Sequence, residues 1–232
     1  MRLLWVVLVA VAAVGTRPTA AQKLDGGAGL GLVWAQPIGA FARTADPTVG
    51  ISMWLAIGPP RSGWAVRGEF HFVEEHPVAD GIPDPHFVPA PGLTTPELVS
   101  LYTDIVGVTF GPVMMGRLGR VPSSAWLAFG IDDIEPSYGW SEGPLRFGDE
   151  PGAPGGSSFS IALGGSVLLF ARERPDFCAG LELSVELLVH PNASYLDRPP
   201  VDASGLRWRG TDGSANLLRI GVGFGARGPG MR

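Results

Sequence analysis

The segment from Phe177 to His190, FCAGLELSVELLVH, alternates between an apolar face and a mixed face over its whole length. Alternation with a period of two predicts a β-strand. The strand exceeds the usual length of about five or six residues in soluble sheets and suits the roughly 9–11 tilted residues with which a strand crosses a membrane. Such a strand would turn its apolar face to lipid, and Glu182 and Glu186 would point into a barrel.

The composition agrees with strands that cross a membrane. Hydrophobic residues make up 45% of the chain, yet beyond its start no apolar run reaches the roughly 20 residues that a transmembrane helix requires. The 34 glycines and 22 prolines disfavour long helices and favour strands joined by turns. The single cysteine, Cys178, cannot form an internal disulfide. The formal charge of −5 argues against nucleic acid as a partner.

The start of the chain has the features of a secretory signal peptide. A short basic start precedes an apolar run over residues 3–15, and small residues at 19–21 resemble a cleavage site. We therefore expect residues 1–21 to be the signal peptide and residues 22–232 to form one β-barrel domain. An uncleaved anchor helix is the alternative, although the apolar run is short for one.

The same alternation recurs along the rest of the chain and predicts about eight strands. Their ranges are 27–35, 49–57, 64–73, 98–115, 125–134, 158–170, 177–190 and 216–224. The phase of the fourth range is ambiguous, because Asp104 shares a face with apolar residues. A β-bulge near Asp104 or Gly107 would switch the faces and resolve the conflict.

The predicted connections alternate between short and long. The short ones are residues 58–63, 116–122 and 171–176, and the long ones are residues 36–48, 76–95, 135–156 and 192–215. Outer-membrane barrels have short periplasmic turns and longer extracellular loops, so this pattern would place both ends of the mature chain in the periplasm. The short turns also contain several arginines, whereas the long loops hold many more acidic residues than the short turns do.

Aromatic residues near the strand ends would form two interfacial girdles. Those next to short turns are Trp64, Trp126, Phe177 and Phe224, and those near long loops are Trp34, Phe72, Tyr138, Trp140 and Phe159. The alternative is that they are the core aromatics of a soluble barrel.

The last predicted strand, in LLRIGVGF, places Leu218, Ile220, Val222 and Phe224 on one face. With the opening GAGLGLVWAQPIGAF and the eight alternating segments, it resembles the small outer-membrane β-barrel domain family, which includes the OmpA transmembrane domain and OmpX-like and OmpW-like proteins. The resemblance implies an all-β, eight-stranded antiparallel up-and-down transmembrane barrel without a cofactor. It also implies outer-membrane lipid and the barrel-assembly machinery as partners. Members of that family usually end on an aromatic residue, whereas GARGPGMR follows Phe224 here.

The strand phases also predict a polar barrel interior. Its charged and titratable members would be Arg67, Glu69, His71, Asp132, Glu182, Glu186 and Arg219. Buried charges need partners, so we expect Arg67 and Arg219 to pair with the glutamates. A barrel of eight strands is only wide enough for side chains to fill it, which favours a filled lumen over an open pore.

Other functions are compatible with parts of the pattern. A secreted soluble barrel would line its lumen with the aliphatic face and hold a small apolar ligand. An outer-membrane lipid-modifying hydrolase would need a nucleophile beside an oriented base, and the best candidates are His190, Ser194 and Asp197.

Two acidic sets could bind calcium loosely at the extracellular rim, although neither has EF-hand spacing. They are Asp132, Asp133 and Glu135, and Asp80, Asp84 and His86. We favour a non-enzymatic outer-membrane barrel with a structural or surface-interaction role. Its long loops would contact a surface ligand that no motif identifies.

Overall fold

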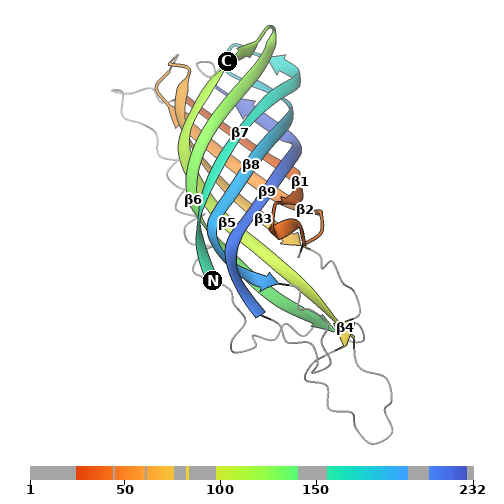
Figure 1. Cartoon of the computed structure of the whole chain (residues 1–232). Helices are drawn as coiled ribbons and strands as arrows, with labels where there is room; N and C mark the ends of the chain where they lie inside the picture. Colours follow the sequence, from red (N-terminus) through yellow and green to blue (C-terminus); the bar gives the residue numbers. More distant parts are fainter. Residues whose placement is uncertain are drawn as a thin grey trace, which may run out of the picture.

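The computed structural model describes residues 25–43, 45–60, 62–75, 82–83, 98–140, 156–197 and 209–228. Within these ranges, eight long strands form a closed antiparallel barrel (Figure 1). They are β1 (Asp25–Ile38), β2 (Thr48–Gly58), β3 (Trp64–Glu75), β5 (Leu98–Leu118), β6 (Val121–Trp140), β7 (Gly156–Glu173), β8 (Cys178–Asp197) and β9 (Arg209–Arg227). A two-residue strand, β4 (Ile82–Pro83), pairs with the start of β5, and a short 3-10 helix, η1 (Phe41–Arg43), follows β1.

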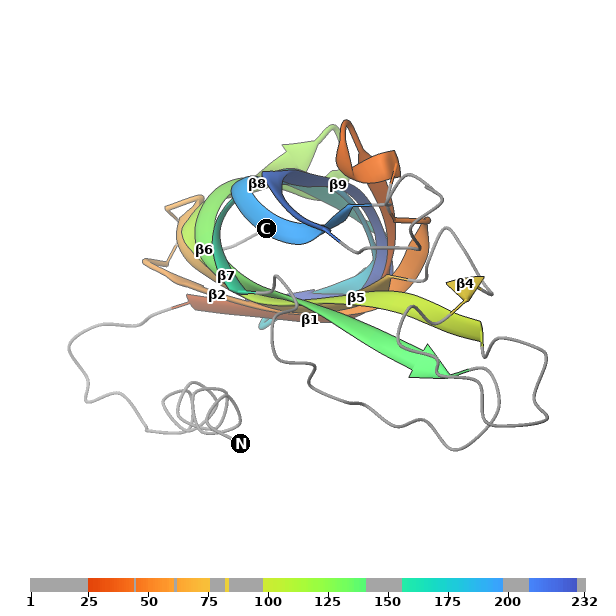
Figure 2. The same ribbon diagram turned by 60° about the horizontal axis from the view of Figure 1, so that its bottom comes forward.

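Each long strand pairs antiparallel with its neighbours in the chain, and β1 pairs with β9 to close the barrel. The closing register runs from Gly27 opposite Arg227 to Ile38 opposite Asn216. Figure 2 shows the ring of strands viewed obliquely from one end. The predicted eight-stranded up-and-down fold is therefore confirmed. In the described part of the chain, no helix has the length and apolarity needed to cross a membrane.

The strands extend further toward the long connections than the alternation predicted. β5 and β6 pair as far as Val99 opposite Trp140, and β8 and β9 pair as far as Asp197 opposite Arg209. The predicted loops 135–156 and 192–215 were therefore too long. Polar residues and a proline interrupt the apolar alternation at the start of these segments, whereas a ladder of backbone hydrogen bonds does not need an apolar face.

The phase around Asp104, which the sequence left open, is continuous, and no bulge lies near Asp104 or Gly107. β5 keeps one register against β3 and one against β6 through this region, so Asp104 stays on the outward face. It lies opposite Glu74 on one side and Glu135 on the other, toward the long connections. The bulges of the described strands lie elsewhere, between Leu169 and Arg172 and between His190 and Ala193.

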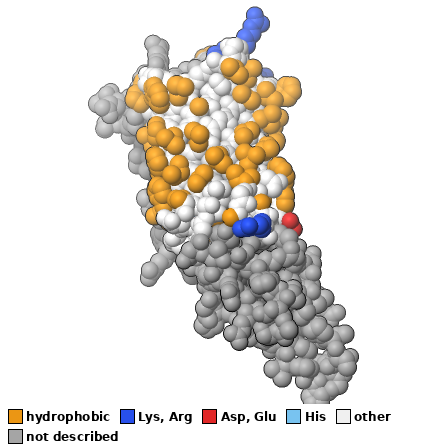
Figure 3. Space-filling view, in the orientation of Figure 1, with side chains coloured by type: hydrophobic (Ala, Val, Ile, Leu, Met, Phe, Trp, Pro, Cys, Tyr) orange, Lys and Arg blue, Asp and Glu red, His pale blue; other side chains and the backbone are white. Residues whose placement is uncertain are grey.

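The two faces of the barrel wall differ in chemistry. Large apolar side chains on the outer face are well exposed and form a band around the barrel (Figure 3). Prominent members of this band are Leu32, Val66, Phe110, Ile131, Leu163, Val222 and Phe224. The inner face carries the buried side chains, which include both apolar and charged residues.

Candidate functional site

The structure places all seven predicted interior residues inside the barrel. Arg67, Glu69, His71, Asp132, Glu182, Glu186 and Arg219 are each no more than 6% exposed. Their backbones lie on several different strands, so the contacts among them join parts of the sequence that are far apart.

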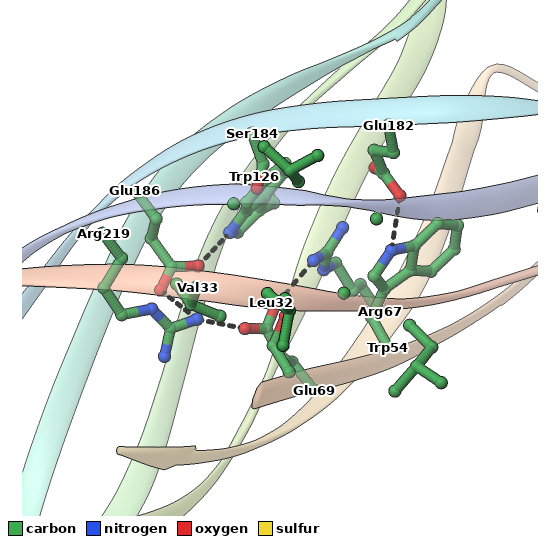
Figure 4. A pocket seen from close by; sticks show the side chains of 16 residues that line it. Leu32, Val33, Trp54, Arg67, Glu69, Trp126, Glu182, Ser184, Glu186 and Arg219 are labelled. Atoms are coloured by element: carbon green, nitrogen blue, oxygen red, sulfur yellow. Dashed lines mark hydrogen bonds and ion pairs between the residues drawn. The ribbon is translucent and has the colours of Figure 1, made fainter. Parts of the chain in front are cut away.

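Four of these residues form a continuous chain of ion pairs (Figure 4). Arg67 donates from Nη2 to Glu69 Oε2 at 2.5 Å. Arg219 Nη2 then contacts Glu69 Oε1 and lies 2.8 Å from Glu186 Oε1. Charge-assisted hydrogen bonds of this kind are about twice as strong as neutral ones. The chain therefore links β3, β9 and β8 across the lumen.

Two tryptophans enclose the Arg67 guanidinium inside the barrel. Its carbon lies 3.9 Å from the Trp126 ring centroid and 4.8 Å from that of Trp54. Each indole also donates a hydrogen bond, from Trp54 Nε1 to Glu182 Oε2 at 2.8 Å and from Trp126 Nε1 to Glu186 Oε2 at 2.7 Å. The prediction that Trp126 belongs to a rim girdle is wrong. Its side chain is only 4% exposed and fills the lumen.

Glu182 has different partners from those expected. It accepts hydrogen bonds from Trp54 and from Ser166 Oγ, the latter at 2.6 Å, and its nearest arginine is Arg227, at 3.9 Å. Arg227 is 1% exposed and points inward. Sequence reasoning missed it because the last predicted strand ended at Phe224. Position 227 is an even number of residues from inward-facing Arg219, so continuing the strand past Phe224 would have placed Arg227 on the inner face.

A second interior cluster joins two histidines to one aspartate. Asp132 Oδ2 lies 2.5 Å from His190 Nε2 and 3.3 Å from His71 Nε2, and all three side chains are fully buried. His190 Nδ1 also contacts the carbonyl oxygen of Ala215. Both ring nitrogens of His190 are therefore engaged inside the barrel, one by the Asp132 carboxyl group and one by a backbone carbonyl.

The same contacts bear on the alternatives from the sequence. Asp132 and Ala215 occupy both nitrogens of His190, so neither nitrogen is free to take a proton from Ser194. Asp133 and Glu135 lie on the outer face while Asp132 points inward, which separates the first candidate calcium set. The Asp80, Asp84 and His86 set lies outside the described residues, as do the side chains of Asp197, Tyr138 and Trp140.

Inward-facing glycines make these cross-barrel contacts possible. His71, Gly107 and Asp132 occupy one row across β3, β5 and β6. A Cβ at Gly107 would collide with the Asp132 carboxylate. Trp126, Gly164 and Glu186 form a similar row, and there a Cβ on the glycine would lie 2.5 Å from the indole. In both rows the glycine lies on the middle one of three adjacent strands, and its missing side chain lets residues on the two outer strands of the row contact each other.

These side chains leave little free space in the lumen. The cavity among Trp54, Arg67, Glu69 and Trp126 has a volume of about 20 Å³, which is room for roughly one water molecule (Figure 4).

No protein-family model matches the sequence, and no curated protein is significantly similar to it. Among solved structures, the chain is similar to Ail of Yersinia pestis in complex with the heparin analogue sucrose octasulfate, with 13% identity, a TM-score of 0.49 and coverage of 89% of this chain and 99% of that chain. A major outer membrane protein from Thermus thermophilus shares 12% identity, with a TM-score of 0.48 and coverage of 89% and 100%. Neisserial surface protein A shares 9% identity, with a TM-score of 0.40 and coverage of 90% and 99%.

Because no family model or curated relative matches, the assignment depends on the barrel itself. Eight antiparallel strands close on themselves, apolar side chains cover the outside, and paired charges lie inside. These are the properties of membrane-spanning barrels with few strands. The chain is an all-β, eight-stranded antiparallel up-and-down barrel with an apolar outer face.

Proposed function

We propose that this chain is a non-catalytic, integral outer-membrane barrel with a structural or surface-interaction role. The observation that carries the proposal is the distribution of side chains between the two faces of one closed sheet. Apolar residues such as Leu32, Val66 and Ile131 are more than 60% exposed on the outside, whereas Arg67, Glu69 and Arg219 are buried inside. An exposed apolar surface that surrounds the molecule is suited to lipid and unfavourable in water.

The arrangement does not favour the soluble alternative. A water-soluble barrel that holds an apolar ligand would have its aliphatic face in the lumen and its charges outside. Here the lumen holds the ion-pair chain from Arg67 to Glu186, and the cavity beside that chain has room for about one water molecule.

The interior charges support a closed lumen as part of the proposal. Arg67, Arg219 and Arg227 lie among the carboxylates of Glu69, Glu182 and Glu186, and each of the six is within 4.0 Å of an oppositely charged member. Asp132 contacts His71 and His190. An ion that entered the lumen would have to separate these pairs and displace the Arg67 guanidinium from its two tryptophans. We therefore propose that the barrel does not conduct.

The remaining parts of the proposal concern biogenesis and the cell surface. The signal peptide of residues 1–21 would direct the chain across the inner membrane. The last strand, with Leu218, Ile220, Val222 and Phe224 facing outward, would be presented to the barrel-assembly machinery. The strand ends beyond the apolar band and the long connections would carry any surface ligand.

Heat-modifiable migration and membrane fractionation test the proposal. The mature chain should migrate faster unheated than boiled, and it should fractionate with the outer membrane. In planar bilayers, it should give no discrete openings. A mature chain that stays folded and monomeric in detergent-free buffer would contradict the membrane assignment, and steady discrete openings would contradict the closed lumen.

A further inference from the structure

The hairpin between β7 and β8 contains a strained aromatic residue at the edge of the apolar band. Phe170 has a φ of +50°, in the left-handed region that residues other than glycine rarely adopt. Its side chain is 89% exposed. Strain at a non-glycine residue persists where the surrounding structure enforces it and often marks a functional surface.

A β-bulge enforces this conformation and changes which residues face outward. β7 pairs Leu169 with Leu181 but then Arg172 with Ala179, so β7 has one extra residue. Glycine at position 180 leaves room for the bulge, because a Cβ there would lie 2.5 Å from the Leu169 carbonyl oxygen. Without the extra residue, the alternation would turn Arg172 toward the lumen. With it, Arg172 lies opposite outward-facing Ala179.

The hairpin and the strand ends beside it carry two exposed arginines and two exposed phenylalanines. Arg174 lies over the Phe177 ring, with its guanidinium carbon 5.6 Å from the centroid, and its amide donates to the Phe177 carbonyl at 2.8 Å. Among the described residues, no carboxylate forms an ion pair with Arg172 or Arg174. Figure 3 shows basic side chains projecting beyond the apolar band at this end of the barrel.

Toward the long connections, the outer face carries a group of carboxylates. There Glu74, Asp104 and Glu135 lie side by side on three adjacent strands, and Asp133 shares their face. Short turns mark the basic end as the periplasmic side of an outer-membrane barrel. Phospholipid phosphates at that interface are anionic, arginine binds phosphate with two parallel hydrogen bonds, and aromatic rings settle at the boundary between acyl chains and headgroups.

We propose that Phe170, Arg172, Arg174 and Phe177 form a docking surface for the headgroup of an anionic phospholipid in the periplasmic leaflet. The two guanidinium groups bind the phosphate, and Phe170 lies against the upper part of an acyl chain. The inference rests on the proposed membrane location of the barrel and adds a lipid preference to it.

The test uses the mature full-length protein, folded in neutral detergent micelles and titrated with phosphatidylglycerol or phosphatidylcholine. Native mass spectrometry counts the bound lipids. The wild-type protein should retain phosphatidylglycerol in preference to phosphatidylcholine. The Arg172→Gln/Arg174→Gln variant should bind phosphatidylglycerol at least about fivefold more weakly, since each basic residue near an anionic surface contributes about that factor.

Arg120→Gln is the matched control, because it removes an arginine from the neighbouring β5–β6 turn. This variant should keep the lipid preference of the wild-type protein. The docking surface is refuted if the wild-type protein shows no preference, or if the double variant and the control lose it equally. Heat-modifiable migration of the same samples separates the two proposals: a barrel that folds without a lipid preference overturns the docking surface alone, and a chain that does not fold in micelles overturns the membrane assignment.

Discussion

The outer and inner faces of this barrel come from alternate residues of the same strands, but different physical requirements shape them. The outer face requires only apolar character, since fluid lipid adapts to any side-chain shape. The inner face requires shape and pairing together, because Arg67 fits between two indoles and His71 reaches Asp132 only over a glycine. Substitutions that preserve polarity should therefore be tolerated outside and harmful inside.

The largest effect is expected where a substitution strands buried charges. Arg219→Met removes the cation that lies between Glu69 and Glu186 and leaves the latter without its arginine. We expect a loss of about 3–5 kcal/mol in the free energy of unfolding, because an uncompensated buried charge costs this much. Urea unfolding of the barrel in lipid vesicles measures the loss. Wild-type stability in this variant would show that the ion pairs are not needed to balance the interior.

A charge placed on the outer face should lower the free energy of unfolding by less than an unpaired interior charge does, because lipid disfavours the charge but the interior stays intact. Leu163, 58% exposed on β7, is a suitable position. Leu163→Arg should destabilise the vesicle-embedded barrel by about 2–4 kcal/mol, as arginine does near the bilayer midplane. The matched Leu163→Val should change stability by less than about 1 kcal/mol. Equal stability of both variants would mean that this face does not contact lipid.

Adding a single methyl group tests the comparison more finely. Gly107→Ala places a Cβ against the Asp132 carboxylate, whereas Gly116→Ala meets no atom within 4 Å. We expect Gly107→Ala to lower the free energy of unfolding by about 1–3 kcal/mol through overpacking, and Gly116→Ala to change it by less than about 0.5 kcal/mol. Parallel unfolding curves measure the difference. If Gly107→Ala did not change stability, the His71–Asp132 contact would not depend on the space left by the missing side chain at Gly107.

The smallest effect concerns the strained phenylalanine of the β7–β8 hairpin. Phe170→Gly removes the penalty of a positive φ, so the barrel should gain about 1 kcal/mol in neutral detergent. In vesicles that contain phosphatidylglycerol, the gain should shrink, because the aromatic contact with lipid is lost. A gain of the same size in both media would show that Phe170 makes no useful contact with the bilayer.

The sequence predicted the face of a residue better than its partner. Alternation alone assigned Arg67, Glu182 and Arg219 to one side of their strands, because the side-chain period of a strand is two. It could not show that Glu182 contacts Trp54 and Arg227, because contacts across a barrel depend on the stagger between strands, which periodicity does not encode.

One wrong assignment arose because a local feature was given more weight than the phase of the strand. Trp126 was assigned to a girdle because it lies near a strand end, although its phase points inward. The phase around Asp104 stayed open in the sequence because a charge shared a face with apolar residues, and the strand carries Asp104 to the long-loop end of the outer face. The bulge beside Phe170 was not predicted. It is accommodated by Gly180 on the partner strand, and one glycine in so glycine-rich a chain does not mark a bulge.

Tryptophan quenching by phospholipids with brominated acyl chains tests the assignment of the two faces most directly. Trp64 is 57% exposed on the outer face, and Trp126 is 4% exposed in the lumen. The account predicts that Trp64→Phe lowers the quenchable fraction of the fluorescence in vesicles and that Trp126→Phe raises it. The opposite result, with Trp126 quenched and Trp64 untouched by the brominated chains, would contradict the account.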